Sequence, residues 1–317
     1  MSSPAVRSAA QQARDLGLSA AIEVIGIDKS FFAGSPVLCD ISLTIGDGEM
    51  VALIGASGSG KSTLIRSIAG LLKIDRPDKI RNGEAGRVRI LDQPMQEDGR
   101  ICGAASRLRA QVGVIFQQFN LVPRLSVLTN VCLGLLGQIP AWRGNLSRFT
   151  RPEKQKAMQA LARVGIAEHA LKRGSELSVG QQQRAAIART LVQGAKVLIA
   201  DEPIASLDPK AARRVMDILA ELNRKDGITV LVSLHQVEFA LAYCPRTIAL
   251  REGRIVFDGA SKALTPAFLN ELYGAESEEL LLPGLGAVPL SATPNGHGAV
   301  APVELPPILN DAGSVRA

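Results

Sequence analysis

The sequence predicts an α/β fold, and three observations support this prediction. The chain has 317 residues, of which 46% are hydrophobic and 21% charged, so it can bury a sizeable core. Aromatic residues make up only 3%, which leaves Ala, Val, Ile and Leu to build that core, as in helices packed on a buried parallel sheet. Short β-rich runs alternate with helical stretches from Ile22 to about residue 272.

The composition divides the chain into three parts. Residues 1–20 are rich in Ala, Ser and Gln and are predicted to be an N-terminal extension, while residues 21–272 form the folded body. Residues 273–317 are predicted to be a disordered tail, because they are rich in Pro and Gly and carry five acidic residues against one arginine. The net charge of +6 therefore averages a basic body and an acidic tail, and by itself it selects no class of partner.

The four cysteines lie far apart, and there are only three histidines, so the sequence predicts neither a zinc site nor a disulfide framework. This usage fits a reducing compartment. No apolar run reaches the 18 residues that could span a bilayer, and the first residues lack the apolar region of a secretory signal. If the protein works at a membrane, it needs a partner that crosses it.

A glycine-rich phosphate-binding loop follows the first buried run, Met50–Ile54. The GxxxxGK[ST] pattern lies between this strand and a helix that is predicted to bury Leu64, Ile65, Ile68, Leu71 and Leu72 on one face. Backbone N–H groups of such a loop surround phosphate oxygens, Lys61 can reach the terminal phosphates, and Ser62 can bind Mg²⁺. An incidental Gly-rich turn is the alternative. The predicted ATP-binding residues are Gly55, Ala56, Ser57, Gly58, Ser59, Gly60, Lys61, Ser62 and Thr63.

Two adjacent carboxylates end a second buried run, Lys196–Ala200. Successive side chains of a strand point to opposite sides, so Asp201 and Glu202 can serve different purposes. Asp201 is predicted to hold Mg²⁺, and Glu202 is predicted to act as general base on the attacking water. Considered alone, the Asp-Glu-Pro sequence could instead begin a helix as an N-cap.

The run Leu177-Ser-Val-Gly-Gln-Gln-Gln-Arg184, together with Asp201-Glu202-Pro203 and Ser206-Leu-Asp208, resembles the nucleotide-binding subunit of ABC transporters over roughly residues 22–272. The resemblance implies a P-loop NTPase with a RecA-like core, an antiparallel β subdomain and an inserted helical subdomain at about 119–182. It also implies roles at the nucleotide: Phe31 or Phe32 would stack on adenine, Gln117 (rather than Gln118) would sense Mg²⁺ and the membrane partner, and His235 would contact the γ-phosphate. Other residues would act between two copies of the chain. Asp208 would lie in a dimer loop, and the signature that binds ATP held by a second copy would be formed by Ser178, Val179, Gly180 and Gln181.

One residue departs from the family pattern, because Val179 stands where Gly is usual in the signature. A β-branched residue disfavours a positive φ and narrows the approach to the backbone. The sequence therefore predicts an ATPase that works more slowly if the backbone at this position needs a positive φ.

The resemblance implies the ATP-hydrolysing subunit of a membrane importer, acting with ATP and Mg²⁺ as a head-to-tail homodimer. Its partners would be integral-membrane permease subunits, which dock near Gln117, and indirectly a solute-binding protein, but no nucleic acid. The chain would lie peripherally on the cytoplasmic face of the inner membrane. It is most similar to the phosphonate importer ATPases, through Phe116–Val131 and Pro203-Ile-Ala-Ser206. Alternatives are a phosphate-like oxyanion or polar amino acid as solute, and a soluble ABC ATPase. A P-loop kinase would not explain the signature.

Overall fold

Two β-sheets form the framework of the part of the chain that the structure describes. The computed structural model describes residues 19–32, 35–76, 86–117 and 120–274, all within one compact unit. One sheet has five strands in the order β2-β1-β4-β5-β6, and the other has six in the order β11-β10-β3-β9-β8-β7. The strands are β1 (Ala20–Phe32), β2 (Ser35–Gly46), β3 (Met50–Ile54), β4 (Arg87–Ile90), β5 (Gln93–Glu97), β6 (Arg100–Ile101), β7 (Val112–Ile115), β8 (Val197–Ala200), β9 (Thr229–Ser233), β10 (Arg246–Arg251) and β11 (Arg254–Ala260).

The six-stranded sheet is parallel except for its last pair, β10 and β11. Strand β3 lies at its centre, with Leu53 in register with Ser233 of β9 and Ile248 of β10. Because parallel strands end at the same edge of a sheet, the loops that follow β3, β8 and β9 lie next to one another. That edge brings the phosphate loop and the two adjacent carboxylates together.

The period of two along β3 divides its side chains between two cores. Val51 and Leu53 pack on the face shared with the five-stranded antiparallel sheet, whereas Ala52 and Ile54 face the core that contains the long helices. The α/β prediction, with a RecA-like parallel core and an antiparallel β subdomain, is thus confirmed.

Helix α2 (Lys61–Ile68) packs between the two sheets, against β2 and β4. It is shorter than predicted, because Gly70 adopts a left-handed conformation with φ 67° and ends the helical path. Leu71 lies beyond the helix and is 51% exposed, so the prediction that it shares the buried face of Leu64 was wrong.

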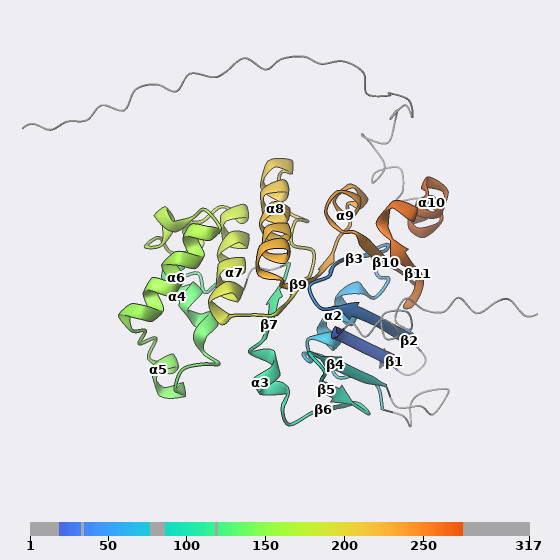
Figure 1. Cartoon of the computed structure of the whole chain (residues 1–317), viewed down its shortest axis with the longest axis horizontal. Helices are drawn as coiled ribbons and strands as arrows, with labels where there is room; N and C mark the ends of the chain where they lie inside the picture. Colours follow the sequence, from blue (N-terminus) through green and yellow to red (C-terminus); the bar gives the residue numbers. More distant parts are fainter. Residues whose placement is uncertain (1–18, 33–34, 77–85, 118–119, 275–317) are drawn as a thin grey trace, which may run out of the picture. The chain divides into compact units, whose positions relative to one another are not determined.

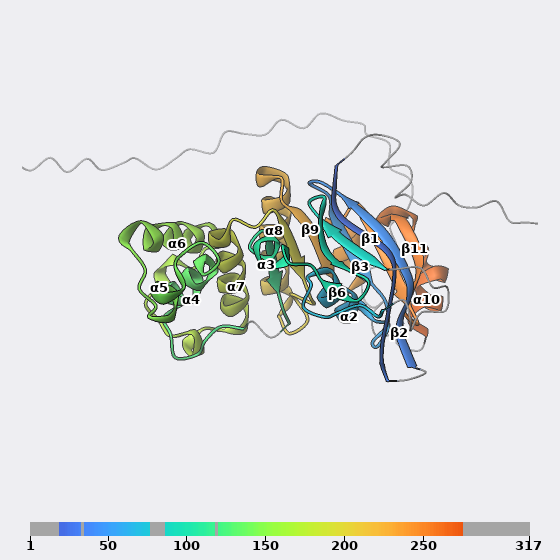
Figure 2. The same cartoon turned by 90° about the horizontal axis from the view of Figure 1, so that it is seen from below.

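A group of helices is inserted after β7. It contains α4 (Val127–Cys132), α5 (Ala141–Asn145), α6 (Arg151–Arg163) and the first turns of α7 (Val179–Gln193), with short 3-10 turns at Leu133–Leu135, Ala167–His169 and Gly174–Glu176. Helices α4, α6 and α7 pack on one another, and α7 also contacts β7 and α8 (Figures 1 and 2). These elements lie within the range predicted for a helical subdomain, and α7 connects them to the parallel sheet.

The remaining helices are α3 (Ala105–Arg109), α8 (Pro209–Asp226), α9 (Val237–Tyr243) and α10 (Pro266–Tyr273), with a 3-10 turn at Ser261–Ala263. Strand β1 begins at Ala20 and α10 ends at Tyr273, so each regular element extends one residue past the boundary predicted for the body. Most of the predicted N-terminal extension and the predicted tail from residue 275 lie outside the described residues. Within the described ranges, no helix combines the length and the apolar character needed to cross a bilayer.

Candidate functional site

The phosphate loop connects β3 to α2 and requires glycine at two close approaches. Gly55 has φ 149°, and a Cβ there would lie 2.2 Å from the carbonyl oxygen of Leu250. Gly60 caps α2 with φ 105°, and a Cβ there would lie 2.9 Å from the carbonyl oxygen of Val37. The loop is therefore wrapped tightly between β2 and β10, with the N-terminus of α2 at its end. Backbone N–H groups in this arrangement form an anion-binding cradle.

Lys61 is only 4% exposed, and its amine is folded back on the loop. Its Nζ donates to the carbonyl oxygens of Gly55, at 2.7 Å, and Ala56, at 3.1 Å. The Ser59 Oγ is buried nearby and has no hydrogen-bond partner among the described residues. A phosphate oxygen in this loop could accept from both groups.

The structure brings the predicted magnesium residues Ser62 and Asp201 together. Asp201 follows β8, is 3% exposed, and accepts hydrogen bonds at its Oδ1 from the hydroxyls of Ser62 and Ser233, both at 3.0 Å. The described residues contain no cluster of three or more His, Cys, Asp or Glu side chains suited to a metal. One carboxylate and one hydroxyl fit Mg²⁺, which commonly takes its remaining oxygen ligands from waters and nucleotide phosphates.

Glu202 has an unusual backbone for a non-glycine residue, with φ 50°. Its N–H donates to Ser233 Oγ at 2.8 Å, and its Oε1 lies 2.6 Å from His235 Nε2. This hydrogen bond from His235 holds the pKa of the Glu202 carboxyl below its usual range. Electrostatic interactions of the carboxyl with His235 and Lys61 add to the lowering of its pKa, and burial opposes it. The two carboxylates thus have different partners, the hydroxyls of Ser62 and Ser233 for Asp201 and the ring of His235 for Glu202.

Lys61, Glu202 and His235 line a cleft of about 520 Å³, termed here the nucleotide cleft, whereas Asp201 is not among its lining residues. Gln117 reaches it from the end of β7 and also lines a neighbouring cleft of about 710 Å³, beside Asn120 and Ser175. Phe31 and Phe32 are not among the lining residues; they are 55% and 80% exposed at the end of β1. The nucleotide cleft is lined by Val37, Ser57, Gly58, Ser59, Gly60, Lys61, Ser62, Thr63, Gln117, Glu202 and His235.

The signature residues begin helix α7. Ser178 is its N-cap, with Ser178 Oγ accepting from the N–H of Gln181 and Gln181 Oε1 accepting from the N–H of Ser178, which is a capping box. Val179 is the first helical residue and its φ is not positive, so the backbone strain considered for this position does not arise. Its side chain is 41% exposed.

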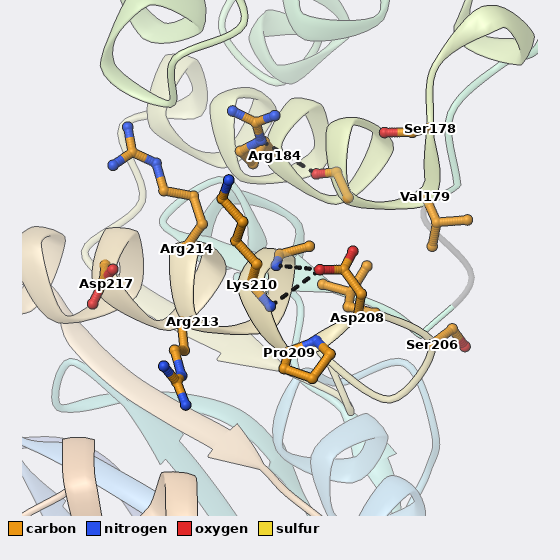
Figure 3. A pocket seen from close by; sticks show the side chains of 13 residues that line it. Ser178, Val179, Arg184, Ser206, Asp208, Pro209, Lys210, Arg213, Arg214 and Asp217 are labelled. Carbon is orange, nitrogen blue, oxygen red and sulfur yellow. Dashed lines mark hydrogen bonds between the residues drawn. The ribbon is translucent and has the colours of Figure 1, made fainter.

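A third cleft, of about 1090 Å³ and termed here the signature cleft, opens between the N-termini of α7 and α8 (Figure 3). Ser178, Val179 and Gly180 line it on α7. On the opposite side Asp208 is the N-cap of α8, and its Oδ1 accepts from the backbone N–H groups of Lys210 and Ala211.

Four basic side chains surround the signature cleft: Arg184, Lys210, Arg213 and Arg214. Lys210, Arg213 and Arg214 form no ion pair with any described residue. Burial, followed by the charge of Arg214, lowers the pKa of the Arg184 guanidinium, while Glu168 opposes the lowering. The cleft thus carries four basic side chains against two carboxylates, Asp208 and Asp217, and is positively charged overall.

The signature cleft and the nucleotide cleft share no lining residue. The sequence motifs thus assemble into two separate sites in one chain. One residue that joins the two carboxylates escaped the sequence analysis. Ser233 joins Asp201 to the backbone of Glu202, and a lone hydroxyl at a strand end has no sequence signature.

Comparisons with known proteins agree with this geometry. Residues 38–205 match the family described as ABC transporter. The chain is 58% identical, over 265 residues, to phosphonates import ATP-binding protein PhnC 1 of Pseudomonas aeruginosa, covering 84% of this chain and 93% of that one. It is 53% identical, over 269 residues, to phosphonates import ATP-binding protein PhnC of Cupriavidus pinatubonensis, covering 85% of this chain and 93% of that one. A solved dimeric, post-hydrolysis ATP-binding cassette bound to ADP and Pi has a TM-score of 0.64 at 29% identity, covering 77% of this chain and all of that one.

Proposed function

The chain belongs to the ABC transporter family, and from that premise we propose that it hydrolyses ATP to energise the import of phosphonates. The observation that carries the proposal is the group formed by Lys61, Ser62, Asp201, Glu202 and His235, which meet at the carboxyl edge of the parallel sheet. The names of the relatives in Pseudomonas and Cupriavidus support the solute.

Binding of ATP exchanges the partners of Lys61. Its amine leaves the carbonyls of Gly55 and Ala56 and donates to the terminal phosphates, where it neutralises charge that grows in the transition state. Ser62, Asp201 and Gln117 would hold Mg²⁺, which would offset the charge on the phosphate oxygens. Phe31 or Phe32 stacks on adenine once the nucleotide is in place.

Hydrolysis depends on Glu202 and His235. A glutamate is ionised near neutral pH, so the Glu202 carboxylate can accept a hydrogen bond from the attacking water and order it. His235 exchanges its bond to Glu202 for the γ-phosphate, which frees the carboxylate to face the water. Ser233 fixes the backbone of Glu202 in the required strained conformation.

The active unit is a head-to-tail dimer with Asp208 near the contact. Within one chain the signature does not reach the nucleotide cleft, so Ser178, Val179, Gly180 and Gln181 act on ATP held by a second copy. The dimeric cassette bound to ADP and Pi supports this arrangement. The ATP-binding domain spans residues 21–272, with the helical subdomain at about 119–182.

Coupling to transport uses Gln117. It lies between the nucleotide cleft and the neighbouring cleft beside Asn120, so a permease helix seated there can sense the nucleotide. The chain therefore lies peripherally at the cytoplasmic face of the inner membrane, bound to permease subunits that receive solute from a binding protein.

Reconstitution with the permease and the phosphonate-binding protein in vesicles tests the proposal. We expect a phosphonate-loaded binding protein to stimulate ATP hydrolysis and uptake several-fold. A Glu202→Gln complex is the control and should do neither, because losing a general base costs about 10²- to 10⁴-fold. Stimulation by a different solute, with none by phosphonates, would contradict the assigned solute.

A further inference from the structure

A hydrogen-bond chain connects His169 to the signature serine. His169 belongs to the 3-10 turn Ala167–His169, and its Nε2 lies 2.8 Å from Nε2 of Gln181. The other end of the same carboxamide, Gln181 Oε1, accepts from the N–H of Ser178 at 2.9 Å. A single side chain, Gln181, thus joins His169 to the N-cap of α7.

The direction of each bond follows from the chemistry of the groups. The N–H of Ser178 can only donate, so Gln181 must direct its oxygen to Ser178 and its NH₂ to His169. An NH₂ group can only donate, so His169 Nε2 must accept and therefore carries no proton. A proton on His169 Nε2 would make it a donor facing the NH₂ group of Gln181, which is also a donor.

The charged neighbours of His169 give the protonated ring a different partner. Glu168, on the same turn, has its Oε1 at 3.4 Å from His169 Nε2. On α7, Arg184 donates to the carbonyls of Val164 and Gly165, at the end of α6, and experiences the charge of Glu168. Protonated Nε2 would donate to the Glu168 carboxylate, and the bond to Gln181 would be lost.

We propose that neutral His169 is a positioning residue for the signature, holding the Gln181 carboxamide so that the capping box fixes Ser178. The inference rests on the proposed function, in which Ser178 acts on ATP held by a second copy. Protonation of His169 releases Gln181, loosens the N-cap and slows hydrolysis, so the signature responds to acid independently of the nucleotide cleft.

Two variants of the full-length chain test this against the wild type. His169→Gln places a carboxamide oxygen near the position of Nε2, so it keeps an acceptor that does not titrate between pH 6 and 8. His169→Ala removes the acceptor. His235 is present in all three chains, so the comparison isolates the change at position 169.

We expect His169→Gln to match the wild-type kcat at pH 8 and to exceed it at pH 6 by up to about fivefold, since one capping interaction is worth about a factor of five. His169→Ala should lose about fivefold in kcat at pH 8, with ATP affinity of the monomer unchanged. Equal pH profiles for wild type and His169→Gln, or a wild-type rate for His169→Ala, would overturn the proposal.

The side-chain amide resonance of Gln181 in the nucleotide-free chain supplies a readout that needs no hydrolysis. It should shift between pH 8 and pH 6 in the wild type and stay fixed in His169→Gln. An unshifted wild-type resonance overturns the proposal even if the ATPase profiles differ. A shifted resonance in a chain that hydrolyses no ATP would instead contradict the proposed function and leave the His169–Gln181 bond standing.

Discussion

The nucleotide cleft and the signature cleft differ in whether their charged side chains have bonding partners within the chain. In and next to the nucleotide cleft each charged group already has a partner: Lys61 bonds two carbonyls, Asp201 two hydroxyls, and Glu202 pairs with His235. In the signature cleft, Lys210 and Arg214 stand on one helix without an ion pair among the described residues.

The difference indicates how the two clefts work. A site whose charged side chains are bonded to other groups of the same chain can keep its conformation until ATP replaces those groups. A cluster of like charges repels itself and is stabilised only when an anion arrives. Since the basic side chains of the signature cleft outnumber its two carboxylates, we infer that the remaining counter-charge comes from ATP bound in the nucleotide cleft of a second copy.

The largest loss of ATPase activity should come from a substitution that disables either cleft alone. Lys61→Ala removes the amine that would contact the phosphates, so kcat/KM should fall about a hundredfold or more, and the monomer should lose ATP affinity. Ser178→Arg should lower kcat/KM as much as Lys61→Ala does, because the larger side chain obstructs the signature cleft. It should leave the ATP affinity of the monomer within about twofold of the wild-type value, because the two clefts share no residue.

Nucleotide titration of dilute monomer, beside steady-state ATPase rates, separates these outcomes. Thermal unfolding serves as the control, since loss of the Ser178 N-cap by itself costs about 1 kcal/mol. If Ser178→Arg weakened ATP binding to the monomer as much as Lys61→Ala does, the separation of the two clefts would be wrong.

A smaller effect should follow from neutralising the signature cleft. In a Glu202→Gln background, which retains ATP, the double variant Lys210→Gln with Arg214→Gln should weaken ATP-driven dimerisation about tenfold, and added salt should weaken the parent in the same direction. Sedimentation at several protein concentrations gives the dimer Kd.

The matched control lies at the other end of α8, where Arg224 and Lys225 are exposed and belong to neither cleft. Arg224→Gln with Lys225→Gln makes the same change in net charge. It should leave the dimer Kd within about twofold, because exposed charges more than a Debye length apart are screened. If both double variants weakened dimerisation equally, the effect would come from net charge and not from the signature cleft.

Much of this organisation was predictable from the sequence, where a local pattern carries its own physics. The strand Met50–Ile54 matches its predicted bounds, because an apolar run followed by a glycine loop has few other structures. The start of α7 at Ser178 is likewise readable from the sequence, since a serine followed three residues later by glutamine forms a capping box. The pairing of Ser62 with Asp201 follows from the strand order of a parallel sheet.

The features that were missed depend on contacts between distant segments. The bond between His235 and Glu202, and the role of Ser233, arise from the backbone conformation after two neighbouring strands, which no single motif encodes. His169 reaches Gln181 only through the fold of the inserted helices. The end of α2 was misplaced because Leu71 continues the apolar pattern, whereas Gly70 ends the helix.

The measurement that tests the central claim most directly is the ATPase activity of a mixture of Lys61→Ala and Ser178→Arg chains, each inactive alone. If one composite site takes its nucleotide cleft from one chain and its signature cleft from the other, mixed dimers contain one intact site. Random pairing then restores up to roughly a quarter of the wild-type rate. A mixture that stays as inactive as its components would contradict the claim that each ATP is shared between two copies.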